Sequence, residues 1–88
     1  MMKKVAILGA RESGIGAAIL ARKQGMDVFV SDSGSIQEKF KNELLSRNIV
    51  FEEGKHSEKL ILECDLIVKS PGIKEQSAII LLLRKEPN

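Results

Sequence analysis

The segment GARESGIGAA, at residues 9 to 18, has the glycine spacing of a turn that binds phosphate groups. Gly9 permits a tight turn after an apolar run, and Gly14 permits close packing of the following helix on a sheet. The first amides of such a helix form a positive, donor-rich anion site, to which Ser13 adds a hydroxyl group. Arg11 stands where the usual motif has its second glycine. The segment is therefore a phosphate-binding turn, a phosphate-binding turn altered for a different ligand, or only a tight turn from strand to helix.

A carboxylate follows the second apolar run. Asp32 ends the segment DVFVSD and lies 18 residues after Gly14. In Rossmann folds an acid at this strand end hydrogen-bonds a ribose hydroxyl group. Asp32 could instead simply cap the turn that follows it, which is the less favoured interpretation. Ser33 and Gly34 continue the loop, which would border a base or a sugar.

A third candidate segment follows the last strand-like run, DLIVKS. Ser70 offers a hydroxyl group, Pro71 has a fixed φ, and the backbone of Gly72 can come close to a ligand. These three residues could also serve only to turn the chain.

The elements that would position these segments alternate between strands and helices. Strands are predicted at 4–8, 27–32, 49–52 and 65–70, and helices at 14–24, from 34 or 35 to about 47, at 57–63 and from 73 to about 85. Short connections between them predict an α/β fold, a Rossmann-like parallel sheet with helices on both faces. Right-handed crossovers give the strand order 3-2-1-4, lacking the fifth strand because the chain stops at RKEPN. Three loops would then meet at the carboxyl ends of the strands: 9–14, 32–35 and 70–73.

Length and charge restrict the function. The chain has 88 residues, enough for one modest core and too few for a second independent domain, so residues 1–88 are expected to form a single domain. The formal net charge is +2, from 14 basic and 12 acidic residues that are interspersed. With no Trp, no Tyr and three Phe, the chain lacks aromatic side chains for base stacking. We therefore expect no nucleic-acid partner.

Apolar runs and cysteine content indicate the compartment. The longest apolar run, AIILLL at 78–83, is far shorter than the roughly 20 residues that span a membrane. Cys64 is the sole cysteine, which excludes an internal disulfide and a cysteine-based metal site and fits a small core residue. We expect a cytoplasmic protein with no membrane partner and no metal site.

Two further polar segments have plain interpretations. His56 follows a turn without a second ligand at metal-binding spacing, which predicts an exposed loop histidine. Glu52 and Glu53 are predicted to form a solvated strand end.

Two long segments together carry a family resemblance: VAILGARESGIGAAILARKQGMDVFVSD and EEGKHSEKLILECDLIVKSPGI. From about Lys4 to Leu83 the chain resembles the N-terminal domain of the MurD-type Mur ligases, bacterial UDP-N-acetylmuramoyl-L-alanine:D-glutamate ligases of peptidoglycan synthesis. The resemblance implies binding of UDP-N-acetylmuramoyl-L-alanine or UDP rather than NAD. It implies that the glycine turn lies at the diphosphate, the loop after the second strand at the uridine, and the SPG segment on the opposite wall. The substrate-binding residues are then expected to be Gly9, Arg11, Glu12, Ser13, Gly14, Asp32, Ser33, Gly34, Ser70, Pro71 and Gly72.

Two departures from the family pattern matter. Arg11 replaces a glycine at the point of close approach to the diphosphate, where its side chain would point to solvent, bind a phosphate or block the site. No P-loop motif is present, so the ATP- and Mg-dependent chemistry is expected in an ATP-binding domain and a C-terminal domain that are absent from these residues. The chain supplies no catalytic residues and is expected to be inactive alone.

An alternative function is a free-standing Rossmann-like module that binds a nucleotide of the NAD type or serves as an interaction domain. The SPGI segment and the lack of a second dinucleotide-binding half favour the ligase interpretation. A last helix with six consecutive apolar residues and an unpaired fourth strand also predict self-association.

Overall fold

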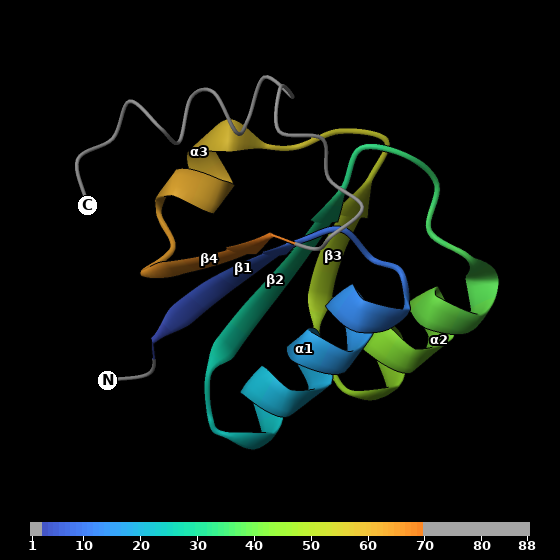
Figure 1. Cartoon of the computed structure of the whole chain (residues 1–88), viewed down its shortest axis with the longest axis horizontal. Helices are drawn as coiled ribbons and strands as arrows, with labels where there is room; N and C mark the ends of the chain where they lie inside the picture. Colours follow the sequence, from blue (N-terminus) through green and yellow to red (C-terminus); the bar gives the residue numbers. More distant parts are fainter. Residues whose placement is uncertain (1–2, 70–88) are drawn as a thin grey trace.

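Strands and helices alternate along the chain, as the computed structural model of residues 3–69 shows (Figure 1). The strands are β1 (Lys4–Leu8), β2 (Asp27–Asp32), β3 (Val50–Glu53) and β4 (Leu66–Lys69). The helices are α1 (Glu12–Lys23), α2 (Glu38–Ser46) and α3 (Glu58–Leu62). Ser70, Pro71, Gly72 and the predicted last helix lie outside the described residues.

The strands form one parallel sheet in the order β3-β2-β1-β4. In its register Ala6 of β1 is opposite Phe29 of β2 on one side and Ile67 of β4 on the other. The predicted α/β class and the strand order 3-2-1-4 are confirmed. Within residues 3–69, β3 and β4 are the two edges of the sheet.

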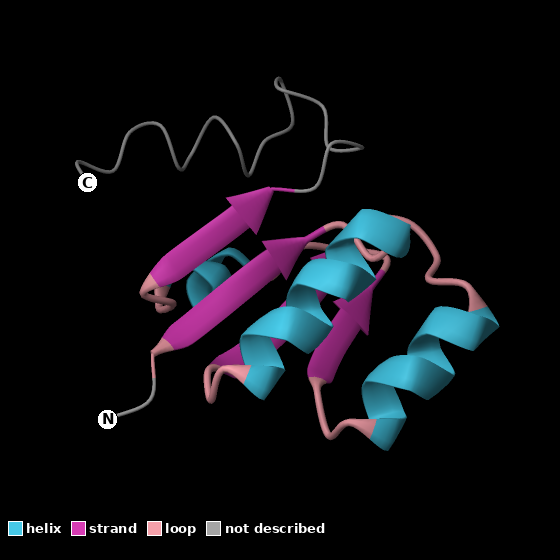
Figure 2. Ribbon diagram, turned by 60° about the horizontal axis from the view of Figure 1, so that its bottom comes forward, coloured by secondary structure: helices cyan, strands magenta, loops and turns pink. Residues whose placement is uncertain are grey.

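Helices cover both faces of the sheet. Figure 2 shows α1 and α2 on one face and α3 on the other. Because strand side chains alternate between faces, Val5 and Ile7 of β1 belong to the core beneath α1 and α2, whereas Ala6 and Leu8 pack with Ile61 of α3. Burial on both faces explains why β1 is a continuous apolar run rather than an alternating one.

The largest differences between the predicted and observed element boundaries are at the starts of two helices. Helix α1 begins at Glu12, two residues before the predicted Gly14. The backbone carbonyl oxygen of Arg11 accepts the N–H of Ile15 at 2.8 Å, so Arg11 is the N-cap of this helix. Helix α2 begins at Glu38, later than predicted, because residues 33–37 form a loop anchored by the buried side chain of Ile36. Ser13 and Gly14 therefore lie within the first turn of α1.

No helix within residues 3–69 is long and apolar enough to cross a membrane.

Candidate functional site

The turn between β1 and α1 requires glycine at both of its ends. Gly9 has a φ of +104°, which side-chain-bearing residues rarely adopt, and its N–H donates to the carbonyl oxygen of Ser31 at 2.8 Å. A Cβ atom on Gly14 would collide with the carbonyl oxygen of Gly9. The two glycines thus hold the start of α1 close to the end of β1, as the sequence predicted.

Asp32 connects this turn to the loop after β2. Its Oδ2 accepts the N–H of Ala10 and its Oδ1 accepts the N–H of Gly34, each at 2.8 Å. The turn-capping interpretation of Asp32 is therefore correct. A carboxylate oxygen has further acceptor capacity, so this role does not preclude a hydrogen bond from a ligand hydroxyl group.

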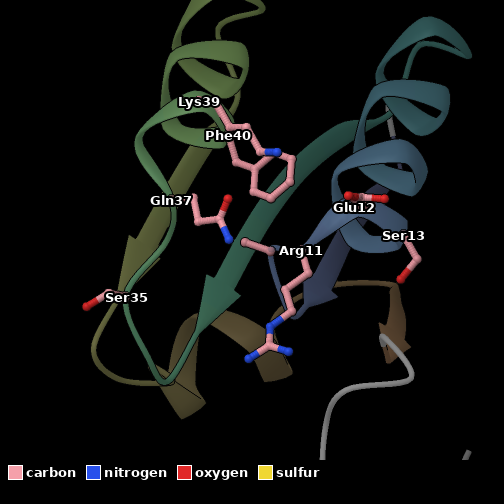
Figure 3. Close-up of a pocket in the computed structure, with 8 residues that line it drawn as sticks. Arg11, Glu12, Ser13, Ser35, Gln37, Lys39 and Phe40 are labelled. Atoms are coloured by element: carbon pink, nitrogen blue, oxygen red, sulfur yellow. The ribbon is translucent and has the colours of Figure 1, made fainter.

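A cavity of about 680 Å³ opens between the starts of α1 and α2 (Figure 3). Figure 3 shows the Arg11 side chain extending away from the two helices, beyond the N-terminal end of α1. The residues that line the cavity come from the glycine turn with the start of α1, and from the loop before α2 with the start of α2: Ala10, Arg11, Glu12, Ser13, Ser35, Gln37, Lys39 and Phe40. Arg11 and Lys39 bring positive charge to this surface, and Glu12 brings one negative charge.

The cavity includes residues that the sequence did not single out. Gln37, Lys39 and Phe40 line it, and the Lys39 ammonium lies 5.0 Å from the centre of the Phe40 ring. Ser33 and Gly34, which the sequence did single out, lie beside Asp32 but do not line the cavity. The reason is that the loop after β2 continues to Gln37 before α2 begins, and Gln37 points toward α1.

Glu52 is not a solvated strand end, contrary to the prediction. It is half-buried, and its Oε2 accepts the Ser31 hydroxyl and the Ser57 N–H, each at 2.7 Å, while its Oε1 accepts the Ser57 hydroxyl at 2.6 Å. Burial raises the pKa of the Glu52 carboxyl, but these hydrogen bonds and the charge of Lys55 outweigh it and hold the pKa below its usual value. Glu52 therefore links β2, β3 and the start of α3.

The prediction of an exposed loop histidine was also wrong. His56 is half-buried, and its Nδ1 lies 2.7 Å from the hydroxyl oxygen of Ser31, which is completely buried. No local signal indicated this contact, because 25 residues separate the two side chains and the sheet alone brings them together.

Glu53 is exposed, as expected for a strand end, but its carboxylate also accepts hydrogen bonds from two other residues. It accepts the N–H of Ile36 at 2.9 Å and the Lys41 ammonium at 3.1 Å. The Ile36 hydrogen bond and the bond from Lys41 lower the pKa of the Glu53 carboxyl. The N–H of Gly54 also donates to the carbonyl oxygen of Gly34 at 2.9 Å. The EEG segment therefore holds the loop that borders the cavity.

Cys64 is half-buried against the core beneath α3, in agreement with the prediction of a small core residue. Its thiol donates to the carbonyl oxygen of Leu60 at 3.4 Å, and burial raises its pKa. Within the described part of the chain, no three potential metal-ligating side chains come together.

Comparisons with known proteins identify the family. A sequence profile described as the MurD N-terminal domain matches residues 4–79. The chain is 52% identical over 86 residues to the UDP-N-acetylmuramoylalanine--D-glutamate ligase of Cytophaga hutchinsonii, covering 98% of this chain and 19% of that protein. It is 49% identical over 85 residues to the enzyme of the same name from Bacteroides fragilis, covering 97% of this chain and 19% of the relative.

A solved structure agrees with these relatives. The pseudomurein peptide ligase type C from Methanothermus fervidus superposes with a TM-score of 0.83 at 27% identity, over 94% of this chain and 17% of that one. The chain thus spans about a fifth of the length of the curated relatives that it matches. The match of the profile to most of the sequence shows that the chain belongs to the MurD N-terminal domain family.

Proposed function

We propose that this chain binds the UDP part of UDP-N-acetylmuramoyl-L-alanine and holds that substrate for an ATP-dependent ligase that adds D-glutamate. The single observation that carries the proposal is the cavity of about 680 Å³ beside the glycine turn, lined by Arg11 and by the first residues of α1. The names of the ligases that the chain resembles support the choice of this substrate.

The diphosphate is assigned to the start of α1. The amides of Ser13 and Gly14 lie in the first turn of a twelve-residue helix, whose N-terminus favours negative charge. Arg11 adds a guanidinium group that can donate two parallel hydrogen bonds to a phosphate. We therefore assign Arg11 to phosphate binding, in place of the backbone approach that a glycine would permit.

The uridine is assigned to the loop after β2. Asp32 holds this loop against the glycine turn through its bonds to Ala10 and Gly34, and Ser33 offers an exposed hydroxyl group there. The predicted opposite wall, formed by Ser70, Pro71 and Gly72, lies outside the described residues and remains a prediction.

The ligation itself is assigned to other parts of a longer ligase. The MurD N-terminal domain profile matches residues 4–79, and relatives about five times longer have room for ATP- and Mg-binding domains. The isolated chain is expected to bind the substrate without forming the amide bond.

Calorimetric titration of the 88-residue chain tests the proposal, with UDP-N-acetylmuramoyl-L-alanine, UDP and NAD in parallel. Saturable binding of the two uridine compounds, and none of NAD, is the expected result. Binding of NAD alone would support the alternative nucleotide-binding module instead. No binding by a folded sample would contradict a nucleotide-binding role of the isolated chain.

A further inference from the structure

Ser31 occupies a junction directly behind the candidate site. Its carbonyl oxygen accepts the N–H of Gly9, and its neighbour Asp32 accepts the N–H of Ala10. Its side chain points to the opposite face of the sheet, where it meets Glu52 and His56. Any group that holds the Ser31 side chain therefore also restrains the strand end that carries Asp32.

The protons around Ser31 can be assigned from the distances. The hydroxyl group has one hydrogen, but three polar atoms lie within hydrogen-bond distance of its oxygen: Glu52 Oε2 at 2.7 Å, His56 Nδ1 at 2.7 Å and the Lys55 carbonyl oxygen at 3.2 Å. A carboxylate oxygen and a hydroxyl oxygen at 2.7 Å repel each other unless a proton lies between them. The depressed pKa of Glu52 leaves that carboxyl without a proton at neutral pH, so the Ser31 hydroxyl must donate to it.

The same argument determines the tautomer of His56. Since the Ser31 proton is used by Glu52, the short contact between Ser31 Oγ and His56 Nδ1 requires a hydrogen on Nδ1. The neutral ring is then protonated on Nδ1, whereas free histidine in water prefers the hydrogen on Nε2. Because Ser31 is completely buried, solvent cannot replace either partner.

We propose that His56, Ser31 and Glu52 form a directed hydrogen-bond chain, with His56 held in its Nδ1–H form, and that this chain makes His56 a positioning residue for Asp32. The bonds run from His56 Nδ1–H to the Ser31 oxygen and from the Ser31 hydroxyl to Glu52. Glu52 in turn accepts the N–H and the hydroxyl of Ser57, which joins the chain to the start of α3. Any effect of this chain on ligand binding by Asp32 rests on the proposed function. The tautomer of His56 and the position of Asp32 do not depend on that function.

The tautomer is measured by long-range ¹⁵N–¹H NMR of the 88-residue chain, at a pH where the ring is neutral. His56 is the sole histidine of the sequence, so the two ring nitrogens are assigned without ambiguity. We expect the nitrogen shifts of the Nδ1–H form. An Nε2–H pattern would overturn the proposal, whether or not the protein binds a nucleotide.

Substitutions test the connection to Asp32. Ser31→Ala removes the acceptor for Nδ1–H and is expected to shift His56 toward the Nε2–H form; an unchanged tautomer would contradict the proposed chain.

His56→Asn retains an N–H donor near the position of Nδ1, whereas His56→Leu does not. The amide resonances of Ala10 and Gly34, which donate to Asp32, are expected to move in the leucine variant and to stay near their original positions in the asparagine variant.

Ser46→Ala is the matched control, because the Ser46 hydroxyl is exposed and bonds only locally to the Glu43 carbonyl oxygen in α2. It is expected to leave the Ala10 and Gly34 resonances unchanged. Wild-type resonances in a folded His56→Leu variant would overturn the positioning role. If that variant does not fold, the Ala10 and Gly34 resonances of Ser31→Ala decide the positioning role, and wild-type positions there would overturn it.

Discussion

The carboxylate of Asp32 accepts the backbone N–H of Ala10 at 2.8 Å, and so joins the end of β2 to the glycine turn that follows β1. The second oxygen of Asp32 accepts the N–H of Gly34 and orders the next loop. One side chain thereby holds together two of the three segments proposed to surround the ligand.

Removal of the Asp32 carboxylate is expected to destabilise the fold as well as the site. Asp32→Ala leaves two backbone amides without their acceptor, which costs about 1–3 kcal/mol in the free energy of unfolding. Urea denaturation measures this loss. Ser33→Ala changes an exposed neighbour and is expected to alter stability by less than about 0.5 kcal/mol. Equal stability of the two variants would show that the Asp32 bonds contribute little.

Two glycines of α1 allow a matched test of the close contact between the start of this helix and the end of β1. Gly14→Ala places a methyl group against the carbonyl oxygen of Gly9, and we expect a loss of about 1–3 kcal/mol in the free energy of unfolding. Gly16→Ala introduces the same methyl group where nothing lies within 4 Å, and is expected to stabilise the helix by about 0.5–1 kcal/mol. Denaturation curves with effects of the same sign would contradict this assignment.

Arg11 is expected to strengthen UDP binding rather than block it. Arg11→Gln removes the charge and is expected to weaken UDP binding about tenfold and to reduce its dependence on salt. Calorimetry at two salt concentrations measures both effects. Lys23→Gln removes one charge at the far end of α1 and serves as the control. Tighter binding by Arg11→Gly would mean instead that the arginine obstructs the diphosphate.

The low pKa of Glu52 predicts an acid-sensitive contribution to stability. A carboxyl whose folded pKa lies below its usual value of 4.5 stabilises the fold above that value, and the contribution is lost as the pH falls through the folded pKa. Glu52→Gln should therefore be less stable than the wild type at neutral pH, and the difference should shrink in acid. Urea denaturation over a pH series measures this difference in the free energy of unfolding. Glu63→Gln, at an exposed position, is the control. A constant difference at all pH values would contradict this role.

The outer edge of β4 is expected to promote self-association. Within residues 3–69 this strand pairs with β1 alone, and Leu66 and Val68 expose 43% and 40% of their surfaces. Light scattering over a concentration series should detect oligomers, and Val68→Lys should reduce them. Leu45→Lys, at a 62% exposed position on α2, is the control. A monomer at high concentration would contradict the prediction.

The alternation of strands and helices, together with the rule of right-handed crossovers, was sufficient to predict the strand order, and local residue types were sufficient for the glycine turn. The apolar run of β1 and the position of Gly9 reflect burial and backbone conformation, which depend mainly on neighbouring residues. The start of α2 was not predictable in this way, because Ile36 is held outside the helix by a hydrogen bond to Glu53, 17 residues away.

The roles of Glu52 and His56 depended on the tertiary structure. In the sequence they are a polar strand end and a loop histidine, and both become partners of Ser31 only because β2 and β3 lie side by side in register. The cavity has the same origin, since Arg11, the N-cap of α1, and Phe40 of α2 come from segments that are distant in the sequence. Alternation of apolar and polar residues specifies which face a side chain takes, whereas the packing of distant segments selects the partner it meets there.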